Sequence, residues 1–179
     1  MENKPGLVFY ATALAGVLVF FSLIGLYVRE FPVFTNTIDA GRLAGIGFVV
    51  GAILAATLLY VFRVRLTPWS KHLPEVMTIL VFTVLFGPLM ASLLNRLGGK
   101  SEYQSFEFLA ETPYLSSNYG ILKGEKIRPT GYNLEVREKG RLLRFRYKTQ
   151  AYYPNTKPGE TVLLPVRRGM LGFRVMTLE

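Results

Sequence analysis

Three long apolar runs separated by short charged connections fill the first half of the chain, at residues 7–28, 43–62 and 76–94. Each run lacks charged side chains, and each is close to the roughly 20 residues that a helix needs to cross a hydrocarbon core of about 30 Å. Backbone groups in lipid must be satisfied within the segment, so each run is predicted to be a transmembrane helix. The sequence therefore predicts an integral membrane protein with a three-helix membrane domain over residues 1–97.

The first run is expected to stay attached as an anchor, because it is longer than the apolar core of a signal peptide and ends without an Ala-x-Ala exit. Arg29 and Glu30 then open the first connection. Residues 31–34 are apolar but too few to cross, so they are predicted to lie on the bilayer surface or under the following domain. A partner site is the alternative for this segment.

Beyond a predicted hinge at 98–101, marked by two glycines that cannot continue a helix cheaply, the pattern becomes one of short alternating segments. Strands are predicted at 103–109, 131–138, 142–150, 161–166 and 172–178. The clearest signal is a hairpin in which Leu134 and Val136 alternate with charged residues before a turn at Lys139-Gly140. Residues 102–179 are therefore predicted to form a soluble β domain, a small OB-like or SH3-like barrel or sandwich.

This predicted arrangement, three helices and then a small β barrel, resembles in outline membrane proteins that append such a barrel to a few helices, including the NfeD-type proteins. The resemblance is one of architecture. It implies a fold class and supplies no activity, because one fold hosts many functions.

Charge bears on orientation. Arg63, Arg65 and Lys71 surround Trp69 in the second connection, a pattern typical of a membrane-interface anchor, and short Lys/Arg-rich loops tend to stay cytoplasmic. This favours a multi-pass protein of a bacterial inner membrane, with a cytoplasmic N-terminus and a periplasmic or extracellular β domain. The opposite orientation stays open, because residues 101–179 hold 13 Lys/Arg and 8 Asp/Glu, a surplus of 5 that suits anionic cytoplasmic lipids.

Small residues predict a close helix contact on the second span. They form two offset rows that together make one face almost flat: Gly47, Gly51 and Ala55, with Gly41 and Gly45 at the start. The contact is expected either with another helix of the same chain or with another subunit. In the third span, Gly87-Pro88 predicts a helix kink, because proline removes a backbone donor.

One strand of the predicted hairpin places Arg144, Arg146 and Lys148 on one face. A solvated sheet face is the simplest interpretation, and a site for lipid headgroups or an acidic partner is the functional alternative. Nucleic acid is not expected as a partner, because single-strand binders interleave exposed aromatic residues with the basic groove.

No catalytic constellation is visible in the sequence. The chain has no cysteine and a single histidine, and its only aspartate, Asp39, is expected on the opposite side of the membrane from His72. We therefore expect no enzyme activity, no cofactor and no metal site.

The expected function is that of an accessory, structural or assembly subunit of a membrane complex, with the β domain as docking module. The partners would be the lipid bilayer and other membrane subunits, or further copies of the chain. The alternative is a homo-oligomeric channel or transporter-like protein, with Thr78, Thr83 and Asn95 facing a pore.

Overall fold

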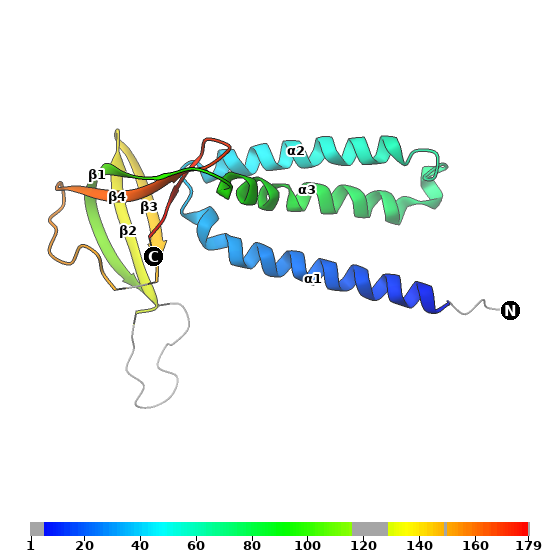
Figure 1. The fold of residues 1–179 in the computed structure, drawn as a ribbon, viewed down its shortest axis with the longest axis horizontal. Helices are drawn as coiled ribbons and strands as arrows, with labels where there is room; N and C mark the ends of the chain where they lie inside the picture. The colour runs from blue at the N-terminus through cyan, green and yellow to red at the C-terminus, as the bar shows by residue number, and fades with distance from the viewer. Residues whose placement is uncertain (1–5, 116–128, 149, 179) are drawn as a thin grey trace, which may run out of the picture.

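The computed structural model describes residues 6–115, 129–148 and 150–178, and it contains three long helices followed by a five-stranded antiparallel sheet. The helices are α1 (Leu7–Thr35), α2 (Ala40–Val61) and α3 (Leu73–Arg96). All three are long and apolar enough to cross a membrane. They extend side by side from one end of the sheet (Figure 1). The predicted fold class, a membrane helical region with a small β barrel, is confirmed.

Helix α1 continues well past the end of the first apolar run. It includes Pro32 and ends at Thr35, so the connection to α2 shrinks to residues 36–39. Residues 31–34 are therefore helical, not a separate surface segment. The extension is physically reasonable because residues 29–35 contain no glycine that would end the helix. A membrane helix also tolerates a proline where neighbouring groups satisfy the carbonyl that loses its backbone donor. As a result, Glu30 lies on a helix.

Helices α2 and α3 pack closely through glycine. Gly47 and Gly51 are buried, and a methyl group placed on Gly47 would lie 2.6 Å from the Cα atom of Pro88. A methyl group on Gly87 would meet the carbonyl oxygen of Gly47. Such contact between backbones requires residues without side chains at the crossing point. Helix α3 passes through Gly87-Pro88 as one continuous helix.

The bundle end farthest from the sheet carries the basic connection. A 3₁₀ turn, η1 (Trp69–Lys71), joins α2 to α3. The side chains predicted as an interface anchor are all exposed there: Arg63, Arg65, Trp69 and Lys71. Arg63 places its guanidinium 4.3 Å from the ring centre of Tyr60, a cation–π contact.

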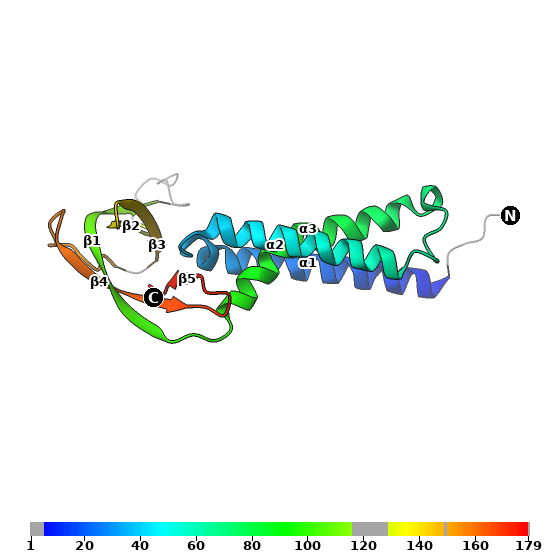
Figure 2. The ribbon, with the colours of Figure 1, turned by 90° about the horizontal axis from the view of Figure 1, so that it is seen from above.

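The sheet is formed by β1 (Ser101–Tyr114), β2 (Gly131–Glu138), β3 (Arg141–Tyr147), β4 (Thr161–Arg168) and β5 (Arg174–Met176). Its order is β3-β2-β1-β4-β5, with every neighbouring pair antiparallel. The long first strand pairs with β2 through its second half and with β4 through its first half, with a register shift between Phe108 and Ala110. A strand that serves two partners in this way curves the sheet, which is visible in Figure 2.

Inward-facing side chains fill the barrel. Phe106, Leu134 and Leu164 are at most 2% exposed and come from three different strands. The predicted hairpin has the expected alternation, and its turn at Lys139-Gly140 has positive φ at both residues. Positive φ at both central residues is the geometry of a type I′ turn, which matches the twist of the flanking strands.

The connection between α1 and α2 closes the barrel. Asn36 and Ile38 exchange backbone hydrogen bonds with β5, from Met176 N to Asn36 O (2.9 Å) and from Ile38 N to Arg174 O (2.7 Å). Thr37 and Val175 form the β-bridge between these bonds. Ile38 is 4% exposed and belongs to the barrel core. The membrane half of the sequence therefore supplies one β-bridge and one core side chain to the β domain.

Candidate functional site at the junction of helices and barrel

Glu30 is a buried carboxylate on a membrane-spanning helix. The residue is 3% exposed and faces α3 from the last turns of α1. An ionisable residue within a membrane helix is costly unless it is paired, so its partners define a candidate site.

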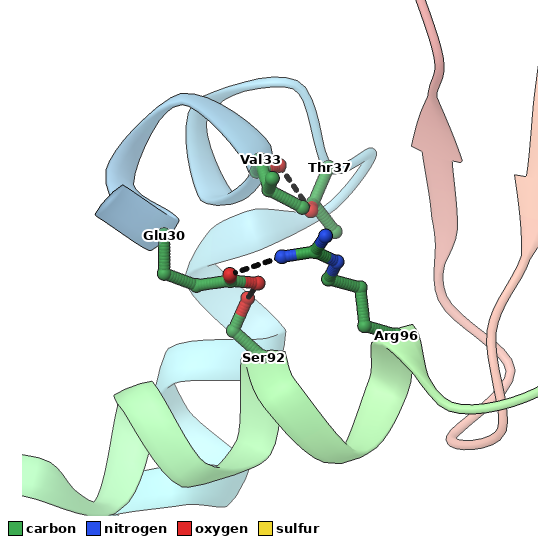
Figure 3. Close-up of polar contacts among 5 residues, drawn as sticks. All are labelled: Glu30, Val33, Thr37, Ser92 and Arg96. Atoms are coloured by element: carbon green, nitrogen blue, oxygen red, sulfur yellow. Dashed lines mark hydrogen bonds and ion pairs between the residues drawn. The ribbon is translucent and has the colours of Figure 1, made fainter. Parts of the chain in front are cut away.

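Two side chains of α3 satisfy this carboxylate (Figure 3). Ser92 Oγ donates a hydrogen bond to Glu30 Oε1 at 3.0 Å, and Arg96 Nη1 donates to Oε2 at 2.8 Å. Ser92 and Arg96 lie four residues apart and therefore project from the same helix face. The Arg96 side chain is 46% exposed and reaches from the pair toward solvent. We call Glu30, Ser92 and Arg96 the charge clamp.

The charge clamp joins two helices that otherwise touch through aromatic rings. Phe20 and Phe82 have ring centres 5.5 Å apart, and Tyr27 and Phe86 lie 6.4 Å apart, each pair spanning α1 and α3. The cavity beside Glu30 holds only about 10 Å³, which is about the space for one water. Both carboxylate oxygens have donors on α3, so the arrangement holds α1 against α3.

Two buried asparagines fasten the barrel to the helices. Asn95, 1% exposed in the last turn of α3, donates to Phe173 O (3.3 Å) and accepts from Leu171 N (3.2 Å). The backbone carbonyl oxygen of Asn95 also accepts a hydrogen bond from Met170 N at 3.1 Å. The loop between β4 and β5 is therefore bound directly to the end of α3.

Asn36 makes the second attachment, on the opposite edge of the sheet. Its side chain pairs with the backbone of Arg146, donating from Nδ2 to the carbonyl oxygen at 2.7 Å and accepting at Oδ1 from the amide at 2.8 Å. The backbone carbonyl oxygen of Asn36 accepts a hydrogen bond from Met176 N of β5, so Asn36 bridges the two edge strands, β3 and β5. One residue thus completes the barrel and links it to the membrane helices.

Replacing Asn36 with alanine is expected to destabilise the barrel by about 2 to 4 kcal/mol, because two backbone groups of Arg146 lose their partner at a buried position. Thermal unfolding of the full chain in detergent, followed by circular dichroism, measures the loss. Asn133→Ala is the matched control, because Asn133 bonds only to the exposed Arg146 side chain in the described contacts. Equal effects of the two substitutions would contradict the bridging role.

Ion pairs around the barrel lower the pKa values of two carboxyl groups. A hydrogen bond from Arg141 at 2.7 Å lowers the pKa of Asp39, the residue that precedes α2. Two hydrogen bonds from Arg174, at 2.6 and 2.8 Å, likewise lower the pKa of Glu138. The first pair joins the closing connection to β3, and the second joins β5 to β2.

The structure distributes the small residues of α2 unevenly. Gly47, Gly51 and Ala55 are buried against α3 of the same chain, whereas Gly41 and Gly45 are exposed with open space around them. The two rows therefore do not form one contact.

The three basic residues singled out on β3 and just beyond it have different surroundings. Arg144 donates from Nε to Glu135 at 2.9 Å, and the Arg146 guanidinium lies 4.5 Å from the ring centre of Tyr114. Lys148 makes no hydrogen bond or ion pair within the described part of the chain. Of these three cations, only Lys148 is without a partner among the described residues.

Sequence reasoning missed Glu30, Asn36 and Asn95 as junction residues. Glu30 and Asn95 flank the apolar runs, and a charged or amide residue within one helical turn of such a run is the signal that could have identified them. Nothing local marks Asn36, whose partners are about 110 residues away along the chain. No protein-family model matches the chain, and comparisons with curated proteins and with solved structures find no significant match.

Proposed function

We propose that this protein is a non-catalytic accessory subunit of a membrane complex, whose barrel docks a partner protein at the membrane surface. The observation that carries the proposal is the outer face of β1 and β4. Tyr103 is 75% exposed and Leu163 is 60% exposed, on neighbouring strands of the sheet. Their cross-strand partners on this face are Pro165 and Ser105, so all four residues are uncharged. We call these four residues the β1–β4 face.

The charged pairs on the β2–β3 side contrast with this face. On the β2–β3 side, Arg137 pairs with Glu107 and Arg144 with Glu135, which is typical of a solvated sheet face. Exposed apolar residues on neighbouring strands are instead typical of interaction sites. The attachments through Asn36 and Asn95 would hold the β1–β4 face at a fixed height above the bilayer, as a docking module requires.

The polar residues considered for a channel are engaged elsewhere. Thr78 and Thr83 donate to carbonyls one turn earlier in α3, at 2.7 Å each, and Asn95 is bound to the barrel. These contacts favour the accessory-subunit function over a pore built from those side chains.

We further propose that the host membrane is a bacterial inner membrane, with the N-terminus in the cytoplasm and the barrel outside. The basic connection around Trp69, at the bundle end farthest from the barrel, supports this orientation (Figure 1).

One labelling experiment tests docking and orientation together. The chain has no cysteine, so Ser105→Cys on the β1–β4 face and Leu142→Cys on the exposed start of β3 each introduce a single thiol. A membrane-impermeant maleimide is applied to intact cells and then to purified protein in detergent. Docking predicts that Ser105→Cys reacts at least about tenfold more slowly in native membranes than after purification, while Leu142→Cys reacts equally in both.

Labelling of Ser105→Cys as fast as that of Leu142→Cys in both preparations would overturn docking at this face. Labelling of Ser105→Cys that is slower than that of Leu142→Cys in both preparations would identify the partner as a second copy of the chain. Labelling of Leu142→Cys only after the cells are permeabilised would place the barrel in the cytoplasm and reverse the proposed orientation.

A further inference from the structure

A cleft of about 540 Å³ lies where the ends of α1 and α3 meet the barrel. Pro32 and Val33 line it from α1, and Asn95 and Arg96 line it from α3. The other walls come from Asn36, from β3, β4 and β5, and from residues next to these strands. The barrel sits directly against the ends of the helices (Figures 1 and 2).

The charged residues of the cleft are all cationic. Of the fourteen described residues that line it, four are Lys or Arg and none is Asp or Glu: Arg96, Arg146, Lys148 and Arg167. A concentration of one sign of charge in a recess raises the local concentration of ligands with the opposite charge.

Three of these cations retain unused hydrogen-bond donors. In the described contacts, Arg96 uses Nη1 for Glu30 and Arg167 uses Nε for the carbonyl oxygen of Gly98 at 2.9 Å. Lys148 has no partner within the described residues. A guanidinium has five N–H donors and an ammonium has three, so a phosphate entering the cleft would find several.

The position of the cleft selects the source of that phosphate. Helices α1 and α3 are long and apolar enough to cross a membrane, and the cleft lies at their last turns. We therefore expect the cleft to lie at the depth of the lipid headgroups. Its wall also contains Pro32, which is exposed, and Val33 and Leu178, which are half-buried, and these offer apolar contact to a glycerol backbone and the first acyl carbons. A soluble phosphate would contact only the Lys and Arg side chains of the cleft and not its apolar wall. We propose that this cleft binds the headgroup of an anionic glycerophospholipid.

The experiment uses the full chain in nanodiscs of phosphatidylcholine with a minor fraction of phosphatidylglycerol. Native mass spectrometry counts the phosphatidylglycerol retained after gentle removal of bulk lipid, and titration gives its affinity. The test variant is Lys148→Gln with Arg167→Gln. The matched control is Arg137→Gln with Arg144→Gln, which removes two charges from the outer sheet face, where both residues pair with glutamates.

We expect the wild-type protein and the control to prefer phosphatidylglycerol, and the test variant to bind it on the order of 30-fold more weakly. Lys148→Gln alone should lose about fivefold, which keeps the test valid if Arg167→Gln disturbs folding. Millimolar inorganic phosphate should not displace the lipid.

Equal losses in the test variant and the control would show a general effect of net charge and overturn the proposal. Absence of any preference for phosphatidylglycerol would do the same, and displacement by inorganic phosphate would show that the site recognises phosphate without the lipid. The cleft and the β1–β4 face involve different residues, so cysteine labelling and lipid retention can fail independently.

Discussion

Replacing Arg96 with glutamine is expected to destabilise the protein by about 3 to 5 kcal/mol, the largest effect of any single substitution considered for this chain. The Glu30 carboxyl group would be left at a position that is 3% exposed, with only the Ser92 hydroxyl as donor. Breaking a buried ion pair from one side leaves an uncompensated charge, and this costs more than the pair itself contributes. Chemical unfolding of the full chain in mixed micelles, followed by tryptophan fluorescence from Trp69, measures the change.

The double variant Glu30→Gln with Arg96→Gln makes this test specific. Removing both charges should recover most of the stability, because a neutral amide in this position can still accept from Ser92. Arg65→Gln is the matched control at the far end of the bundle, where the side chain is exposed, and it should change stability by less than about 0.5 kcal/mol. A double variant as unstable as Arg96→Gln would contradict the charge clamp.

Substituting alanine for Gly51 is also expected to destabilise the protein, by about 1 to 3 kcal/mol, because of overpacking. The added methyl group would lie against the backbone carbonyl of Thr83, which cannot rotate away as a side chain could. Gly47→Ala should behave similarly, since its methyl group meets the backbone of Pro88. Unfolding of the full chain in mixed micelles again provides the measurement.

Gly45→Ala is a control that predicts the opposite sign. It lies on the same helix with open space around it, and alanine is favoured over glycine in a helix by about 1 kcal/mol. The protein should therefore become slightly more stable. If Gly51→Ala also stabilised the protein, the close packing of α2 against α3 would be wrong, whereas a smaller particle mass at unchanged stability would indicate that Gly51 contacts another subunit.

The sequence by itself determined the elements that depend on periodicity. Charge-free runs of about 20 residues predict membrane helices, and the alternation around Leu134 and Phe145 predicts a hairpin with a buried face, since these patterns reflect local backbone geometry. The class of fold followed from their order along the chain. The extension of α1 to Thr35 did not, because residues 29–34 mix charge, proline and apolar side chains without a clear period.

Only the tertiary structure decided how the two halves join. The Glu30 carboxylate, the Asn36 bridge and the Asn95 attachment each depend on partners at least 62 residues away along the chain. Composition and spacing carry no information about such pairs, because the cost of burying a polar group is offset only once the fold supplies its partner. For the same reason, cations that look alike in sequence differ in the fold: Arg144 pairs with Glu135 on the outer sheet face, while Lys148 lines the cleft between the helix ends and the barrel.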